Sequence, residues 1–327
     1  MEKSTTALAH PNIAFIKFWG LKDETNRIPS NGSISMNIGC LSTKTTVTPD
    51  PNLEKDTLTL NGVSVRGAGL TRVRQFMDRI RQMAEGQSFV HIESENNFPI
   101  GAGVASSASG FAALALAGTS ALGLELSERE LSGLARFGSG SACRSIPGGF
   151  VEWVTEPHSG NTYAKSISPA DHWNLVDLIA ILSEQHKPVG SEAGMREAAS
   201  SPLQEARTRD AKRRLDLCRQ AILNRDFEAL AAVTELDSNM MHAVMMTSEP
   251  PLFYWHPHSL AIMKAVKEWQ QEGLAVTYTL DAGPNVHVIA TQAAMGQALS
   301  RLRQFPFVMD VLKGIPAGPA RLIKGQS

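Results

Sequence analysis

Residues 96–112 read NNFPIGAGVASSASGFA, and this stretch decides the fold class that the sequence predicts. Gly101 and Gly103 allow backbone conformations and close approaches that a Cβ atom would prevent, so consecutive N–H groups can turn toward an anion. The residues that follow, 108–122, are rich in Ala and Leu and predict a helix. The positive N-terminal end of such a helix attracts the same anion. The stretch therefore predicts a phosphate-binding loop.

Ser106 and Ser107 add two hydroxyl groups to the predicted phosphate loop. An ordinary loop-to-helix connection is the alternative, and the loop is not a Walker A motif because no Gly-Lys-Ser/Thr follows. The arrangement of residues 99–108 resembles the ATP-binding motif Pro-x-x-x-Gly-Leu-x-Ser-Ser-Ala of the kinase superfamily that includes galactokinase, homoserine kinase and mevalonate kinase. Val104 stands where leucine is usual. The resemblance implies that the two glycines and the two serines contact ATP.

The charged residues of the chain nearly cancel, with 31 Lys and Arg against 32 Asp and Glu. This balance gives no indication of a nucleic-acid or membrane partner. The densest basic stretch, 207–219, also contains Asp210 and Asp216, and we interpret it as the solvated face of a helix. The first residues lack an apolar signal region, and no apolar run approaches the ~18 residues of a membrane span. We therefore expect a cytoplasmic protein.

The three cysteines, Cys40, Cys143 and Cys218, are few, odd in number and widely spaced. This pattern argues against a disulfide framework or a zinc site. We interpret Cys143 as a small buried thiol rather than a nucleophile. No acidic cluster indicates a permanent metal site, so the sequence predicts no metal-ligating residue.

Periodicity along the chain predicts an α+β fold with two lobes. Threonine-rich and apolar alternation predicts strands in both halves, whereas helical spacing dominates from about residue 202 onward. We expect an N-terminal ATP-binding domain at 1–180 and a C-terminal domain at 181–327. The expected strands are 12–20, 43–48, 57–60, 88–92, 150–154, 176–182, 275–280 and 286–290. The expected helices are 70–83, 108–122, 127–137, 202–224, 227–246, 259–272 and 292–303.

Three polar residues stand where chemistry is expected. Lys17 is the one cation in the apolar run NIAFIKFWG, and a buried lysine needs a partner. Arg144 follows Gly-Ser-Gly-Ser-Ala-Cys, and Asp281 precedes Ala-Gly-Pro-Asn directly after an expected strand. Each also has a structural interpretation: Lys17 can extend its ammonium to solvent, Arg144 can cap a helix or pair with a structural acid, and Asp281 can form an Asx turn.

Four ordered motifs resemble those of the diphosphomevalonate decarboxylases. Residues 12–20 resemble their Asn-Ile-Ala-x-Ile-Lys-Tyr-Trp-Gly, and 97–110 resemble their phosphate loop. Residues 138–153 are similar to Gly-Ser-Gly-Ser-Ala-Cys-Arg-Ser…Gly-Gly-Phe-Val-Glu-Trp, and 278–285 to Tyr-Thr-x-Asp-Ala-Gly-Pro-Asn. The resemblance covers nearly the whole chain. It implies a small-molecule-kinase superfamily fold and an ATP-driven decarboxylation.

The resemblance also implies roles for the three polar residues. Asp281 would position or deprotonate the C3 hydroxyl of a mevalonate ester as it attacks the γ-phosphate of ATP. Lys17 would keep that carboxylate ionised and hydrogen-bond the same hydroxyl. Arg144 would hold the substrate carboxylate with its planar fork before CO₂ leaves.

The remaining equipment follows from phosphoryl transfer in general. ATP with a magnesium ion carried largely by the nucleotide is the expected cofactor, and the loop at 61–69 is expected near the adenine. Ser139, Gly140 and Ser141 suit the phosphate end of the mevalonate ester because their side chains are small and their N–H groups are free to donate. Homodimerisation is implied by the resemblance alone.

Three departures from the family pattern concern the substrate phosphate. Phe18 and Leu21 stand where the family has tyrosine and a second lysine, and in VGSEAGM, which resembles Val-Ser-Ser-Arg-x-Gly-Met, Glu192 follows Ser191 in place of arginine. Losing two charge-assisted hydrogen bonds costs about a hundredfold in affinity, unless Lys22 compensates. We therefore expect mevalonate 5-phosphate as the substrate, giving isopentenyl phosphate, with mevalonate 5-diphosphate as the alternative.

Two other functions fit the same fold. A kinase that stops at the 3-phosphate would release ADP without CO₂. A non-catalytic sensor that binds ATP or a sugar would have little reason to keep Lys17, Arg144 and Asp281 together.

Overall fold

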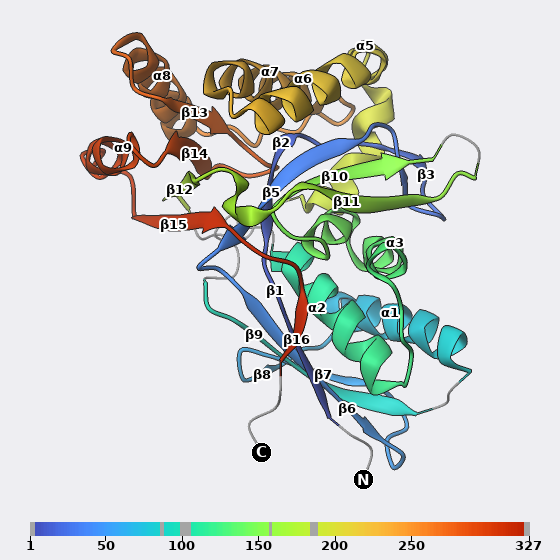
Figure 1. Cartoon of the computed structure of the whole chain (residues 1–327). Helices are drawn as coiled ribbons and strands as arrows, with labels where there is room; N and C mark the ends of the chain where they lie inside the picture. Colours follow the sequence, from blue (N-terminus) through green and yellow to red (C-terminus); the bar gives the residue numbers. More distant parts are fainter. Residues whose placement is uncertain (1–3, 86–87, 99–105, 157–158, 184–188, 324–327) are drawn as a thin grey trace.

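The chain forms two sheets with helices packed on them, which confirms the predicted α+β class and its two-lobed arrangement (Figure 1). The computed structural model describes residues 4–85, 88–98, 106–156, 159–183 and 189–323. The strands are β1 (Thr5–Ala9), β2 (Asn12–Ile16), β3 (Leu21–Asp23), β4 (Ile28–Pro29), β5 (Ser33–Gly39), β6 (Thr43–Asp50), β7 (Thr57–Leu60), β8 (Val63–Ser64), β9 (Phe89–Asn96), β10 (Phe150–Thr155), β11 (Thr162–Ser168), β12 (Leu175–Ile181), β13 (Val276–Thr279), β14 (Val286–Thr291), β15 (Asp310–Pro316) and β16 (Arg321–Ile323). The helices are α1 (Ala68–Ala84), α2 (Ser106–Ala121), α3 (Glu128–Gly138), α4 (Ser191–Arg196), α5 (Gln204–Arg209), α6 (Ala211–Asn224), α7 (Phe227–Met246), α8 (Pro257–Gln271) and α9 (Met295–Leu302), with short 3₁₀ segments η1 (Gly140–Ser145), η2 (Ala170–His172) and η3 (Glu197–Ser200).

The first sheet has six strands in the order β16-β1-β6-β9-β7-β8. Helices α1, α2 and α3 pack on it, and their apolar faces share one core with the sheet (Figure 1). Helix α2 is the central element of this layer, because Ala108, Ala112, Ala113, Ala115 and Ala117 are all fully buried. Small side chains let the helix lie close to the sheet, which carries the start of α2 to the sheet end where β9 finishes.

The second sheet has eight strands in the order β11-β10-β5-β15-β12-β14-β13, with β2 pairing with β5. Helices α6 and α7 bury one face of it, and α8 and α9 bury the other. Strand β12 is buried at every position, which explains why it reads as a continuous apolar run. The alternate residues of β12 enter two different cores, one on each face of the sheet.

The C-terminal strands return to the N-terminal half of the chain. Strand β15 pairs with β5, and β16 pairs with β1 at the edge of the first sheet (Figure 1). The sequence pattern predicted neither strand; for β16 the reason is that it has three residues and lies at a sheet edge with little buried surface. The proposed division of the chain at residue 180 stays a prediction.

The interpretation of residues 207–219 as a solvated helix face is wrong in part. Arg207 and Arg214 are 1% and 0% exposed, whereas Lys212 and Arg213 of the same stretch are exposed. The reason is a buried carboxylate on α7: Asp237 accepts a hydrogen bond from Arg214 Nε at 2.8 Å. The expected helix at 202–224 is also divided at Asp210 into α5 and α6.

Within the described part of the chain, no helix combines the length and the apolar character that crossing a membrane requires.

Candidate active site

Lys17 and Asp281 form an ion pair, although 264 positions separate them in the chain. Lys17 directly follows β2, and Asp281 lies two residues beyond the end of β13. The Lys17 ammonium donates to Asp281 Oδ1 at 2.7 Å, and the side chains are 2% and 33% exposed. The lysine therefore reaches its partner from the protein interior, while a third of the Asp281 side chain is exposed. This contact supplies the partner that a buried lysine needs.

Two consecutive residues of α7 fix the segments that carry the pair. Asp237 Oδ2 accepts a hydrogen bond from the Lys17 backbone N–H at 2.6 Å. Ser238 Oγ accepts one from the Leu280 backbone N–H at 3.0 Å, one residue before Asp281. A single helical turn thus holds both segments in register. Such rigid support is what a catalytic pair requires, because its geometry must be set before the substrate arrives.

The carbonyl of Lys17 is held as firmly as its N–H group. Arg207 Nη2 donates to it at 2.8 Å, and Asn31 Nδ2 donates to it at 2.9 Å. Arg207 and Asp237 are themselves buried, with Arg207 Nη2 3.8 Å from Asp237 Oδ2. Buried charges are costly unless each has partners, and here Arg207 and Asp237 partner each other and the backbone of Lys17. The position of the Lys17 backbone is therefore fixed by several buried groups.

Arg144 lies in η1 and is 4% exposed. Its guanidinium donates to Ser33 Oγ at 2.7 Å, Ser35 Oγ at 3.1 Å and Asn12 Oδ1 at 3.2 Å. Among the described residues, no carboxylate lies within ion-pair distance of it, so neither the capping nor the structural-acid interpretation applies. Burial lowers the pKa of Arg144, and the Asp281 carboxylate acts in the opposite direction. A buried cation to which the described residues supply no acid partner is a candidate binding site for an anion.

The structure describes the predicted phosphate loop only up to residue 98 and again from Ser106, where α2 starts. Gly101 and Gly103 lie outside the described residues. Ser106 and Ser107 form the first turn of α2, where unpaired N–H groups and the helix dipole favour a phosphate. An adjacent cavity of about 230 Å³ lies between the first sheet and α1 and α2. Its lining includes the side chains of Leu58, Leu60, Val73, Ser94, Phe111 and Leu114.

The cavity has the composition that a flat heteroaromatic ring needs, with apolar walls and a few hydroxyl groups. Leu60 ends β7, so the cavity touches the start of the loop expected near the adenine. Ser106 and Ser107 line the same cavity. These residues therefore fit a nucleotide with its base in the cavity and its phosphates at the helix N-terminus.

Ser139 lies between the start of α2 and Ser141, which is predicted to contact the substrate phosphate. Its hydroxyl lies 3.3 Å from Ser107 Oγ and 3.5 Å from Ser141 Oγ. Gly140 lies against Phe18, since a Cβ atom added there would approach Phe18 Cε1 to 2.6 Å. Phe18 itself packs edge-on to Trp153, with ring centroids 4.7 Å apart. An apolar ring, packed between Gly140 and Trp153, therefore stands at the position where the resemblance implies a tyrosine hydroxyl.

Cys143 in the same segment fits the interpretation of a buried, inert thiol. The side chain is fully buried, and burial raises its pKa to about 12. A thiol with a raised pKa carries almost no thiolate near neutral pH.

Glu192 faces two arginines from distant elements. Its carboxylate accepts a hydrogen bond from Arg27, which lies between β3 and β4, and forms an ion pair with Arg72 of α1 at 3.2 Å. Burial by itself would raise the pKa of Glu192, but the charges of Arg72 and Arg27 outweigh it and hold the pKa below its ordinary value. Ser191 starts α4 beside Glu192, while Lys22 on β3 is exposed. The substrate contacts expected of Ser191 and Lys22 stay predictions.

His242 lies on α7, five residues after Asp237, and is 1% exposed. Its ring stacks on Trp255 with centroids 5.0 Å apart, and Nε2 has no hydrogen-bond partner among the described residues. The pKa of His242 is lowered to about 3, mainly by burial and then by the Lys17 charge, while the carbonyl of Leu280 acts in the opposite direction. The imidazole is therefore neutral near neutral pH.

This burial predicts a measurable acid sensitivity. Because the folded-state pKa of His242 lies below the unfolded value of ~6.5, the folded protein binds fewer protons and loses stability as the pH falls below ~6.5. From pH ~7.5 to ~5.5 the wild type should lose about 1.4 kcal/mol more unfolding free energy than the His242→Phe protein. Urea titrations at both pH values measure this difference. Equal losses in the two proteins would show that His242 titrates normally.

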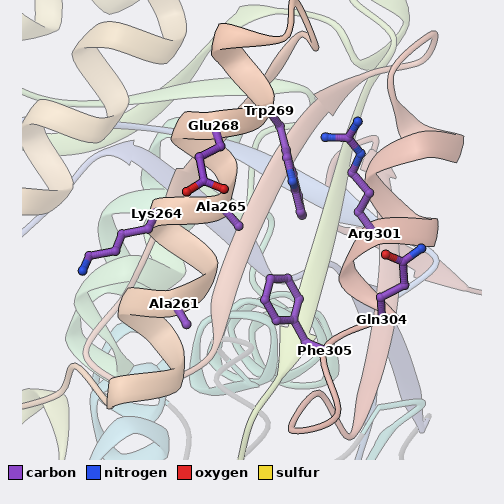
Figure 2. Close-up of a pocket in the computed structure, with 8 residues that line it drawn as sticks. All are labelled: Ala261, Lys264, Ala265, Glu268, Trp269, Arg301, Gln304 and Phe305. Atoms are coloured by element: carbon purple, nitrogen blue, oxygen red, sulfur yellow. The ribbon is translucent and has the colours of Figure 1, made fainter.

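A separate hollow of about 480 Å³ lies between α8 and the segment that begins with α9 (Figure 2). Trp269 and Phe305 flank the hollow, and Arg301 lies at the opposite side from Lys264 (Figure 2). None of the predicted site residues lines it. It is therefore not part of the candidate site.

Sequence reasoning missed several residues that the structure brings to the site. Arg27 and Arg72 lie in ordinary polar positions of a hairpin and a helix, so nothing in their local sequence distinguishes them. Asp237 carried a usable signal, because it is a charged residue in the largely apolar run of α7. A charged residue at such a position is either exposed or paired with an opposite charge inside the protein. Two arginines of residues 207–219 are the partners that Asp237 has in the structure.

Comparisons with known proteins agree with this geometry. Residues 9–166 match the family model described as diphosphomevalonate decarboxylase-like N-terminal domain, and residues 177–317 match the mevalonate 5-diphosphate decarboxylase C-terminal domain. A diphosphomevalonate decarboxylase from Candida albicans is 39% identical, with 91% of this chain and 87% of that protein covered. One from Rattus norvegicus is 35% identical, with 97% and 85% covered.

Solved structures agree as well. Mevalonate diphosphate decarboxylase from Staphylococcus aureus superimposes with a TM-score of 0.94 at 36% identity, covering 99% of both chains. A structure described as MDDEF in complex with MVAPP, AMPPCP and magnesium gives a TM-score of 0.92 at 36% identity, covering 98% of this chain and 99% of that one.

Proposed function

Because the chain belongs to the diphosphomevalonate decarboxylase family, we propose that it converts mevalonate 5-diphosphate and ATP to isopentenyl diphosphate, CO₂, ADP and phosphate. The chain is an ATP-dependent decarboxylase that uses ATP and Mg²⁺, as its family membership and its nucleotide-bound structural relative indicate. The identity of the phosphorylated ester is the part that we propose. Homodimerisation and a cytoplasmic location stay predictions.

One observation carries the chemistry: the chain holds a carboxylate bound to a buried lysine and, beside strands β2 and β5, a buried arginine to which the described residues supply no acid partner. Asp281, whose side chain is 33% exposed, is the base candidate, and Arg144 is the candidate receptor for the substrate carboxylate. Arg144 Nε donates to Asn12 Oδ1 at the start of β2, and Lys17, which holds Asp281, directly follows the same strand. A substrate that carries a hydroxyl and a carboxylate on neighbouring carbons fits between them.

The two groups can drive phosphoryl transfer, then loss of phosphate, and then loss of CO₂. Asp281 accepts the proton of the C3 hydroxyl while that oxygen attacks the γ-phosphorus of ATP, and ADP leaves. Lys17 holds the Asp281 carboxylate and offsets the negative charge that gathers there. The C3–O bond then breaks and phosphate leaves. The C1–C2 bond breaks next, its electrons form the C2–C3 double bond, and CO₂ departs from Arg144.

ATP fits the residues at the start of α2. We place its base in the cavity bounded by Leu58, Leu60 and Phe111, and its phosphates at Ser106 and Ser107. Magnesium supplies charge neutralisation on the phosphates when it is bound. Ser139 lies within hydrogen-bond distance of Ser107, so the nucleotide phosphates and the substrate loop adjoin each other.

The choice between the two esters rests on opposing observations. The relatives that match over nearly the whole chain are named for the diphosphate, and one of them binds MVAPP. The sequence-based preference for the monophosphate rested on the polar groups missing at Phe18 and Leu21 and on Glu192 in place of an arginine. In the structure, the Glu192 carboxylate is paired with Arg27 and Arg72. Phe18 and the partly buried Leu21 still lack the polar groups of the family. Mevalonate 5-phosphate is therefore the second candidate.

Initial-rate kinetics with three esters test the proposal. With ATP and Mg²⁺ saturating, we expect mevalonate 5-diphosphate to give the highest kcat/KM, 5-phosphate a lower value and unphosphorylated mevalonate the lowest. ADP and CO₂ should be followed together. A higher kcat/KM with the 5-phosphate would replace the proposed substrate by the second candidate.

A further inference from the structure

Glu192 joins three elements that are remote in sequence. Arg27 comes from the segment between β3 and β4, Arg72 from α1, and Glu192 from α4. The side chains are 20%, 34% and 34% exposed, so a ligand can still reach them. Each guanidinium contacts a different oxygen of the carboxylate, Oε1 for Arg27 and Oε2 for Arg72.

The ion-paired group lies at the phosphate end of the candidate site. Arg72 Nε donates to the Gly138 carbonyl at 2.8 Å, and Gly138 directly precedes Ser139. The Arg72 guanidinium also lies over the ring of Phe111, 5.0 Å from its centroid, on the helix that starts with Ser106. Arg72 therefore adjoins both the substrate loop and the nucleotide helix.

A carboxylate between two guanidinium groups makes the contacts that a terminal phosphate would make. Arginine binds carboxylates and phosphates with the same donor fork, and a phosphate brings more charge and more acceptors. Both anions cannot occupy the same donors at once. A substrate whose phosphate chain reaches this point must displace Glu192, whereas a shorter ester leaves the ion pairs intact.

We propose that Glu192 is a specificity-determining residue, an internal anion that competes with the distal phosphate of the substrate for Arg27 and Arg72. The inference rests on the proposed function in one respect, namely that a phosphorylated mevalonate ester binds with its phosphates at this end. Glu192 lowers the affinity for the diphosphate and leaves the affinity for the monophosphate nearly unchanged. Glu192 therefore reduces the ratio by which the enzyme prefers the diphosphate over the monophosphate.

The Glu192→Gln enzyme tests this competition, since the amide keeps the shape and loses the charge. We expect KM for the diphosphate to fall about tenfold and KM for the monophosphate to change less than about twofold, with kcat unaltered. Glu192→Asp, which keeps the charge, should retain the wild-type ratio. Glu197→Gln is the matched control, because Glu197 forms no ion pair with any residue that the structure describes.

Calorimetric binding of inorganic pyrophosphate supplies a readout that needs no turnover. We expect Glu192→Gln to bind it about tenfold tighter than the wild type, and Glu197→Gln to match the wild type. An unchanged ester ratio together with unchanged pyrophosphate affinity would overturn the proposal. Weaker binding of both esters by Glu192→Gln would also overturn the proposal, because Glu192 would then be needed to hold Arg27 and Arg72 in place. If the wild type turned over neither ester, the proposed function would fail while the pyrophosphate comparison would still report on Glu192.

Discussion

The Asp281→Asn enzyme should lose about 10²- to 10⁴-fold in kcat while still binding ATP and the mevalonate ester. In the wild type, the Lys17 ammonium donates to Asp281 Oδ1 at 2.7 Å. Asparagine keeps the size of the side chain and one oxygen for this contact, but an amide cannot accept the substrate proton. The loss should therefore appear in the chemical step and not in binding. Rates of ADP and CO₂ formation measure the first, and calorimetric titration with the ester measures the second.

Asp171→Asn provides the matched control for Asp281→Asn. Asp171 lies in η2 and is exposed, so the same chemical change there should leave kcat at the wild-type value. An Asp281→Asn enzyme that kept more than about a tenth of the wild-type kcat would exclude Asp281 as the general base.

Arg144→Lys should lower kcat/KM for the ester by about 100-fold or more, with little effect on KM for ATP. Lysine keeps the positive charge but cannot donate two parallel hydrogen bonds to a carboxylate while also satisfying Ser33 and Ser35. The substrate carboxylate would then be held at one oxygen and in a poorly defined direction. Steady-state kinetics with each substrate varied in turn separate the two KM values.

The control for Arg144→Lys is another arginine in a bidentate contact outside the site. Arg219 of α6 donates to both oxygens of Glu152, at 2.9 and 2.6 Å. Arg219→Lys should lower the thermal stability and leave the ester kinetics unchanged. If Arg144→Lys changed the melting temperature alone, Arg144 would be a structural residue.

Much of the secondary structure followed from local patterns. The expected helix at 127–137 matches α3, which a capping box at Ser127 and Glu130 starts, and the expected helix at 227–246 matches α7. These elements have strong local signals, in side-chain capping and in apolar spacing. Strands β11 and β16 were missed because they lie at sheet edges, where half or more of the residues are exposed or polar and alternation is weak.

The candidate site was predicted to a different depth at each residue. Lys17, Arg144 and Asp281 were found from motifs, and the structure places Lys17 and Asp281 in contact. The support from Asp237 and Arg207 was not found, because a sequence shows neither which helix face is buried nor which remote segment meets it. Glu192 shows the same limit. Its charge was visible in the sequence, but the two arginines that pair with it were not.

Single-turnover analysis of the purified protein with mevalonate 5-diphosphate, ATP and Mg²⁺ tests the central claim most directly, with ADP and CO₂ quantified from the same sample. The account predicts that ADP and CO₂ appear in equal amounts and that neither forms when the ester is omitted. ADP without CO₂ would contradict it, since phosphorylation at C3 would then be the end of the reaction at the Lys17 and Asp281 pair.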